Sequence, residues 1–183
     1  GIDKDDYQLT NLFVLYQDIL ARLVNSQFVT LAIVYAAMTL VLLLIFRSLP
    51  IALICLVPNL LTTAAVMGGM GLAGIPLDLM TITIAAVAMG ISVDDTIHYV
   101  HRYRQSTGSA PDAVRESMLS VGHAMVYTTL IIVIGFSSLV FSEFVPSILF
   151  GVLTGITMLV ALLMDLTILP VLLQRYIKPS SLA

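Results

Sequence analysis

Five long stretches without a charged residue constrain the fold of this chain more than any other feature of its sequence. A helix of roughly 20 apolar residues crosses a bilayer core about 30 Å thick. The stretches are of that order, and charged residues cluster between them. They are Ser26–Phe46, Ser48–Leu77, Leu79–Val93, Met118–Ser142 and Phe144–Met164. The sequence therefore predicts five membrane-spanning helices.

The composition supports an all-α, polytopic membrane helix bundle. The chain is 59% hydrophobic and 10% charged, whereas about a quarter of the residues in a soluble domain are charged. Its basic residues are divided among short loops and form no continuous stripe, which excludes a nucleic-acid partner. Membrane lipids are the expected surroundings.

The periodicity of apolar residues sets the expected boundaries. Residues 1–25 are expected to form an extracytoplasmic segment and an interfacial amphipathic helix, since Tyr7–Gln27 has a helical apolar period. Residues 26–175 form the five-helix block, and 176–183 a cytoplasmic tail. The third helix is expected to continue to about Arg104, and the fifth to stop at Pro170. The predicted spans are about 28–46, 51–72, 79–101, 119–141 and 147–169.

The distribution of basic residues orients the block. Cytoplasmic loops of membrane proteins carry an excess of Lys and Arg. Six basic residues fall on one side of the predicted topology, namely Arg47, Arg102, Arg104, Arg115, Arg175 and Lys178. We therefore expect a multi-pass protein of the cell (inner) membrane, with its N-terminal segment extracytoplasmic and its C-terminal tail cytoplasmic.

The acidic pair Asp94–Asp95, inside the third predicted span, is the strongest candidate for function. A carboxylate at membrane depth costs about 2.5–3.5 kcal/mol on insertion scales. Two adjacent carboxylates also repel each other, which makes the pair a natural proton acceptor. On a helix Asp94 aligns with Gly90 and His98, and we expect this small-residue stripe at a packed helix interface. Asp95 is turned by about 100° toward another neighbour.

Other readings of these polar residues remain open. The pair could be wetted near the cytoplasmic end and merely pair with Arg102 or a histidine. Thr128 and Thr129 could support a relay by hydrogen-bonding an interior carboxylate, or could bond their own helix. Asp165, five residues before Pro170, is expected to have a structural role at the helix end.

No metal site or cofactor is expected. His98 and His101 have the spacing of a metal-binding pair, and Asp94 is near them in sequence. His123 is the one further histidine, however, and other nitrogen or thiol ligands are lacking.

Several motifs give the chain a resemblance to the resistance-nodulation-division (RND) transporter superfamily. It is most similar to the branch of predicted exporters that includes the mycobacterial-type (MMPL) lipid exporters and the Patched-like proteins with a sterol-sensing domain (SSD). The motifs cover nearly the whole chain. They are Phe46–Leu49, Gly74–Leu77, Gly90–Asp95 with its G-x-x-x-D-D pattern, His98–Arg104, Thr129 with Gly135–Phe136, and Asp165–Leu166 with Leu169–Pro170.

The resemblance implies that this chain is one five-helix block of a larger transporter. Each protein of that family has two such halves, each with a large extracytoplasmic porter domain. The resemblance further implies export of lipidic or hydrophobic molecules driven by the proton-motive force, with protons as coupling ion and Asp94 and Asp95 as the proton relay. The implied partners are the second transmembrane half and the porter domain of the same parent chain. A homo-oligomer is compatible with the sequence.

The sequence bears on two other functions, lipid sensing and intramembrane proteolysis. In the sterol-sensing relatives the block binds lipid, so a sterol- or lipid-sensing module without pumping is the alternative. An intramembrane aspartyl protease needs two aspartates on separate helices that face each other, whereas Asp94 and Asp95 are adjacent on one helix. Asp165 would have to be the partner, and we expect it nearer the interface. We therefore expect no enzyme.

Overall fold

The computed structural model describes residues 14, 26, 29–75 and 79–179, and within these it is helical without strands. The helices are joined by short connections. They are a first helix at Val29–Phe46, α2 (Leu49–Leu72), α3 (Leu79–Gln105), α4 (Ala110–Ser117), the π-helical turn η1 (Met118–Gly122), α5 (His123–Ser137), the 3-10 turn η2 (Ser138–Phe141) and α6 (Val145–Tyr176).

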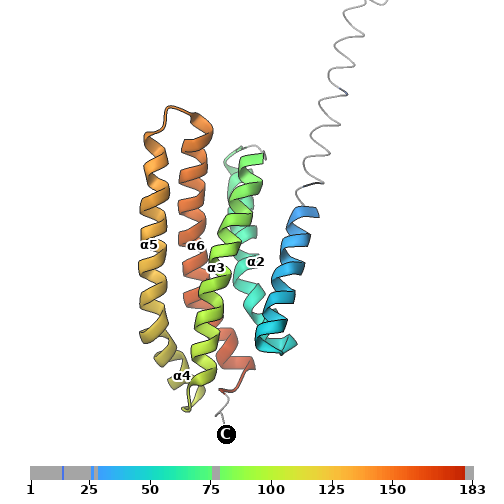
Figure 1. Cartoon of the computed structure of the whole chain (residues 1–183), viewed down its shortest axis with the longest axis vertical. Helices are drawn as coiled ribbons and strands as arrows, with labels where there is room; N and C mark the ends of the chain where they lie inside the picture. Colours follow the sequence, from blue (N-terminus) through green and yellow to red (C-terminus); the bar gives the residue numbers. More distant parts are fainter. Residues whose placement is uncertain (1–13, 15–25, 27–28, 76–78, 180–183) are drawn as a thin grey trace, which may run out of the picture.

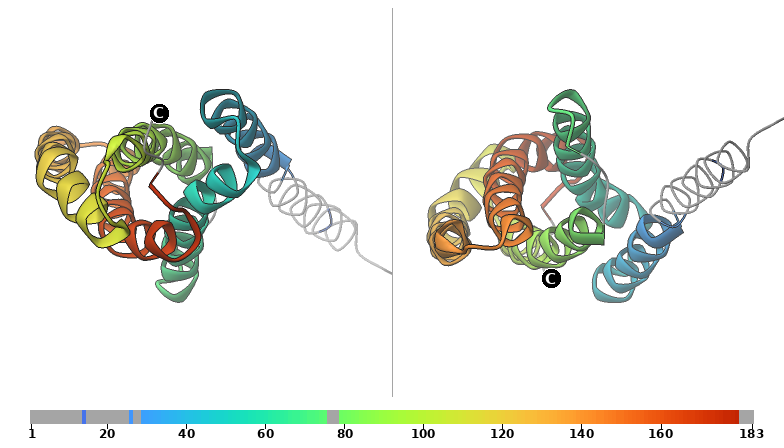
Figure 2. Two further views of the ribbon diagram at one scale, coloured as in Figure 1. Left: turned by 90° about the horizontal axis from the view of Figure 1, so that it is seen from below. Right: turned by 90° about the horizontal axis from the view of Figure 1, so that it is seen from above.

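The long helices lie side by side as an up-and-down bundle (Figure 1). α6 is the central helix and packs against α2, α3 and α5. The end-on views show α5 on one side of α6, and the first helix at the opposite edge beside α2 (Figure 2). The α5–α6 turn lies at the same end of the bundle as the end of α2 and the start of α3, and the C-terminus lies at the other end (Figure 1). The predicted all-α bundle is confirmed.

Four stretches of the described chain are long and apolar enough to cross a membrane. They are Val29–Phe46, Leu49–Leu72, Ala110–Phe141 and Val145–Tyr176. α3 has 27 residues, about 40 Å of helix at 1.5 Å per residue, but its two aspartates and the basic residues of its last turn make it less apolar. It nevertheless packs along α2 and α6 within the bundle, which fits a fifth spanning helix.

The fourth helical stretch begins at Ala110, because α4 continues through η1 into α5, so the span predicted at about 119–141 lies within a longer helix. One predicted helix boundary is wrong. α6 does not stop at Pro170 but runs to Tyr176. Proline removes one backbone hydrogen bond, and neighbouring helices make this tolerable in a membrane bundle; Pro170 is itself buried.

Other expectations fall outside what the structure describes. The amphipathic helix expected in residues 1–25 lies almost entirely outside the described residues, as does the end of the tail. The division into segment, block and tail therefore stays a prediction.

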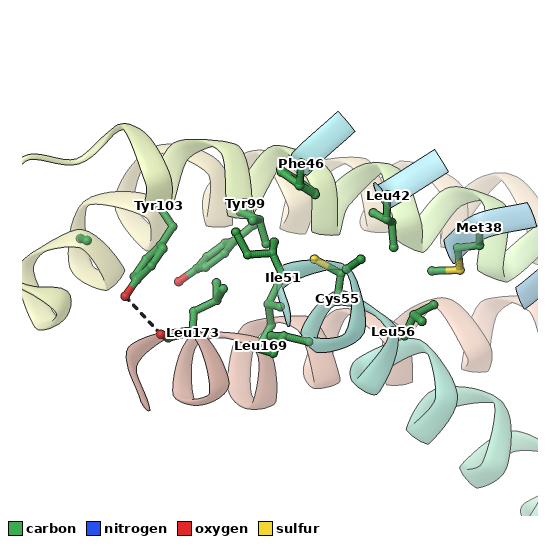
Figure 3. Packing of buried hydrophobic residues seen from close by; sticks show 14 of the residues in the cluster. Met38, Leu42, Phe46, Ile51, Cys55, Leu56, Tyr99, Tyr103, Leu169 and Leu173 are labelled. Atoms are coloured by element: carbon green, nitrogen blue, oxygen red, sulfur yellow. Dashed lines mark hydrogen bonds between the residues drawn. The ribbon is translucent and has the colours of Figure 1, made fainter. Parts of the chain in front are cut away.

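The core lies at the C-terminal end of the bundle. Figure 3 shows Phe46, Ile51, Cys55, Tyr99 and Leu169 packed together from four helices. Tyr103 is fully buried, and its hydroxyl lies 2.8 Å from the Ile177 carbonyl oxygen and 3.3 Å from that of Leu173. This hydroxyl therefore donates to carbonyl groups at the end of α6, where the Ile177 carbonyl has no partner within the helix.

Gly151 sets the distance between α5 and α6. A Cβ at this position would lie 2.5 Å from the Phe136 backbone oxygen and 2.9 Å from the Leu139 Cβ. At Gly155, one turn later, the nearest atom would be 3.9 Å away. Of the two glycines in the G-x-x-x-G packing motif, Gly151 is thus the one that close packing requires.

Candidate functional site

The two adjacent aspartates of α3 occupy different surroundings. The side chain of Asp94 is 73% exposed within the chain, whereas Asp95 is half-buried. Successive helix residues are turned by about 100°, which places Asp95 nearer the contact with α6. The prediction that the pair faces two different environments is confirmed.

The face of α3 that carries Asp94 is open. His98 Nε2 lies 3.6 Å from Asp94 Oδ1, one turn away, and its side chain is 67% exposed. Gly90, one turn in the other direction, is also exposed, and a Cβ there would have no neighbour within 4 Å. Among the described residues no helix packs on the Gly90–Asp94–His98 stripe, so the packed helix interface expected there stays a prediction.

The face of α3 that does pack carries hydroxyl groups. Ser92, Thr96, Tyr99 and Tyr103 are buried, and their spacing of 4, 3 and 4 residues forms one helical stripe. Ser92 is two residues before Asp94, so the two side chains point about 200° apart. This geometry turns Asp94 outward when the hydroxyl stripe faces the bundle.

The hydroxyl stripe of α3 meets a carboxyl group from α6. Asp165 is only 1% exposed. Ser92 Oγ lies 3.1 Å from Asp165 Oδ2, and Thr96 Oγ1 lies 3.0 Å from Asp165 Oδ1. Both carboxyl oxygens of Asp165 are therefore held by α3.

Asp165 is the functional candidate that the sequence reasoning missed. It was expected at a helix end, but α6 continues eleven residues beyond it, to Tyr176. A signal for its burial was present in the spacing of Thr154, Met158, Ala161, Asp165 and Leu169, which places these residues on one helical face. All five are buried.

The threonines of α5 do not reach the carboxyls of α3. Thr128 Oγ1 donates to the backbone oxygen of Met125 at 3.0 Å, the self-bonding alternative considered above. Thr129 is buried, on a helix whose main neighbour is α6. Among the described residues, the hydroxyls that bond an interior carboxyl are those of Ser92 and Thr96.

A pocket of about 380 Å³, partly open at its mouth, lies beside this carboxyl group. It is lined from α2, α3 and α6, and Ser92 belongs to its wall. Most of the other lining side chains are apolar, and the polar ones are Asn59, Thr62, Thr63 and Thr157. Asn59 Oδ1 and Thr62 Oγ1 are buried and have no hydrogen-bond partner among the described residues.

Two comparisons place the chain among known proteins. A model of the MMPL family matches residues 8–176. A protein of Methanocaldococcus jannaschii whose name describes it as a membrane protein is 29% identical over 161 residues, which cover 85% of this chain. The chain spans 42% of the length of that relative. Because the family match extends over most of the sequence and the helices are apolar and long, the chain is a membrane domain that belongs to the MMPL family.

Proposed function

We propose that this domain is one transmembrane half of an exporter that uses the proton-motive force to move lipidic or hydrophobic molecules. Asp94 and Asp95 carry the coupling proton. The observation that carries the proposal is the position of the pair, with Asp95 half-buried against the bundle and Asp94 open on its lateral face.

The exposure of Asp94 supports a partner on this face. A carboxylate exposed to lipid costs about 2.5–3.5 kcal/mol, and a second helical surface over Asp94 and His98 would relieve that cost. The bare backbone at Gly90 permits another helix to approach closely. The proposed partner is the second transmembrane half of the parent chain, whose porter domain would handle the substrate.

Asp95 provides the link to helix movement. It is half-buried on α3, which packs against the central helix α6, and a charged carboxylate in such a position is costly. Binding of a proton to Asp95 removes that charge and changes how α3 packs on α6, so the two protonation states favour different arrangements of the helices. His98, close to Asp94, is the supporting residue on the open face; Thr128 and Thr129 are weaker candidates.

The proposed location is the cell (inner) membrane. The excess of Lys and Arg at the end of the bundle that holds the α3–α4 connection and the C-terminus supports a cytoplasmic position for this end. The α2–α3 and α5–α6 ends then face outward.

The test is proton flux through the full-length protein in liposomes, followed with a trapped pH-sensitive dye after an imposed pH gradient. The Asp94→Asn, Asp95→Asn double variant is expected to lose the protein-dependent flux. Glu143→Gln, which removes an exposed carboxylate from the α5–α6 connection, is the matched control and should retain it. Full flux in the double variant would overturn the proposal.

A lipid-binding module without pumping is the second candidate. The pocket between α2 and α3 favours it, because methionines and aliphatic side chains form most of its wall. A photo-crosslinkable sterol probe would then label the pocket equally well at all pH values and in the Asp94→Asn, Asp95→Asn variant. Labelling that changes strongly with pH would count against lipid sensing alone.

A further inference from the structure

We propose that Asp165 is a proton-binding site of its own, that water reaches it through the pocket between α2 and α3, and that Ser92 connects the pocket to the carboxyl group. This deepens the proposed function and rests on it only for the direction from which protons arrive.

The hydrogen bonds around Thr96 favour a protonated Asp165. Thr96 Oγ1 lies 3.0 Å from the Ser92 backbone oxygen and 3.0 Å from Asp165 Oδ1, but a hydroxyl has a single hydrogen to donate. The Ser92 carbonyl oxygen can only accept. If Thr96 donates to that carbonyl and protonated Asp165 donates to Thr96 Oγ1, both contacts are hydrogen bonds at once. An ionised Asp165 leaves one of them unmade.

The charges around Asp165 also favour the neutral acid. Asp95 of α3 and Cys55 of α2 are the titratable groups that interact with it electrostatically. The ion pairs found in the described part of the chain do not include Asp165. A buried carboxylate without a cationic partner is costly, and such a group holds a proton instead. The remaining titratable groups of the helices packed on α6 are Asp94, His98, Tyr99, His101, Arg102, Tyr103 and Arg104 of α3, His123 and Tyr127 of α5, and Asp112, Arg115 and Glu116 of α4.

The pocket provides the route for water. The space in it that the centre of a water-sized sphere can occupy is about 20 Å³, which exceeds the roughly 10–15 Å³ that a cavity needs to hold one water molecule. A buried polar atom without a partner is rare unless water binds it. Asn59 Oδ1 and Thr62 Oγ1 are two such atoms, on residues 1% and 6% exposed, and both belong to the pocket wall.

Ser92 joins this pocket to the carboxyl group. Its side chain lines the pocket, is 4% exposed and donates to Asp165 Oδ2. A hydroxyl that donates to one neighbour can accept from another, so a water in the pocket can donate to Ser92 Oγ. The pocket is formed by the last turns of α2 and the first half of α3. In the proposed orientation it therefore lies in the extracytoplasmic half of the bundle, on the side where protons are supplied.

Infrared spectroscopy of the full-length protein in membranes tests the protonation directly. A carbonyl band of a protonated carboxylic acid is expected in the wild type, absent in Asp165→Asn and disappearing as the pH rises. Ser92→Ala removes one hydrogen bond and is expected to shift the band without removing it, which assigns the band independently. If no acid band depends on Asp165 or Ser92 at any pH, the proton site is overturned.

Exchange into heavy water tests the route. The acid band is expected to shift on deuteration severalfold more slowly in an Asn59→Leu, Thr62→Val variant than in the wild type. The matched control is Thr167→Val on α6, because that exposed hydroxyl bonds its own helix and lies outside the pocket. Equal exchange in the pocket variant and the control would overturn the route. Proton flux tests the relay through Asp94 and Asp95, whereas the acid band tests Asp165. The band is expected to remain in the Asp94→Asn, Asp95→Asn variant whether or not that relay exists, so failure of one proposal can be told from failure of the other.

Discussion

The hydroxyl of Tyr103 donates to the backbone oxygen of Ile177 at 2.8 Å, and so ties the end of α3 to the residue that follows α6. The Leu173 carbonyl lies close to the same hydroxyl (Figure 3). The side chain is fully buried, and removing the hydroxyl takes this hydrogen bond away from the part-buried Ile177 carbonyl. This contact fixes the C-terminal end of α6, and with it the helix that carries Asp165.

Tyr103→Phe is therefore expected to destabilise the folded protein by about 1 kcal/mol, the net contribution of a typical hydrogen bond. The measurement is thermal unfolding of the full-length protein in detergent. Tyr176→Phe is the control, because its side chain is 65% exposed, and its midpoint should match that of the wild type. Equal midpoints for Tyr103→Phe and Tyr176→Phe would show that the contact does not stabilise the bundle.

Gly151→Ala is expected to lower the unfolding midpoint, since the new Cβ would collide with the Phe136 backbone oxygen and force α5 and α6 apart. Gly155→Ala on the same helix meets only an ordinary contact at 3.9 Å. It should be neutral or stabilising by up to about 1 kcal/mol, because alanine has the higher helix propensity. The reverse order of stability would contradict the close packing at Gly151.

The helices themselves could be predicted from the sequence, because charge-free stretches of membrane length leave the backbone little alternative to a helix. The connection at Arg47–Ser48 followed by Pro50 was equally readable, and Pro50 lies in the first turn of α2. The end of α6 could not be predicted in the same way, because packing on neighbouring helices lets the helix continue past Pro170.

The site was harder to predict because periodicity shows which residues share a face but not which face is buried. Gly90, Asp94 and His98 do form one stripe, yet it is the stripe of Ser92 and Thr96 that packs against α6. Asp165 is 73 residues from Ser92 in the sequence. Only the packing of α3 on α6 brings these two side chains together.

The proposed orientation predicts which surface residues react with a membrane-impermeant maleimide. In a full-length protein that keeps Cys55 but whose cysteines outside this domain have been removed, Glu143→Cys, in the α5–α6 connection, should be labelled in intact cells. Thr107→Cys, in the α3–α4 connection, should be labelled only after the membrane is permeabilised. Both positions are exposed. Cys55 is buried and is the internal control that should remain unlabelled. Labelling of Thr107→Cys in intact cells would reverse the orientation.

Substitutions of Asp165 separate its hydrogen bonds from its proton. Asparagine keeps an acceptor for Ser92 and supplies an N–H for Thr96 Oγ1, as the protonated acid does. Asp165→Asn should therefore stay within about 1 kcal/mol of wild-type stability, whereas Asp165→Leu leaves the buried Ser92 hydroxyl without its partner and should be less stable.

The pH dependence of stability distinguishes Asp165→Asn from the wild type. If the folded wild type holds a proton on Asp165 that the unfolded chain has released, the folded state binds more protons, and stability falls as the pH rises. Asp165→Asn has no such proton, so its unfolding midpoint should fall less than that of the wild type as the pH rises. Thr167→Val, on the same helix and without contact to Asp165, should follow the wild-type curve. Identical pH profiles for the wild type and Asp165→Asn would mean that Asp165 has the same protonation in the folded and unfolded chains. The proposed proton on Asp165 in the folded protein would then be overturned.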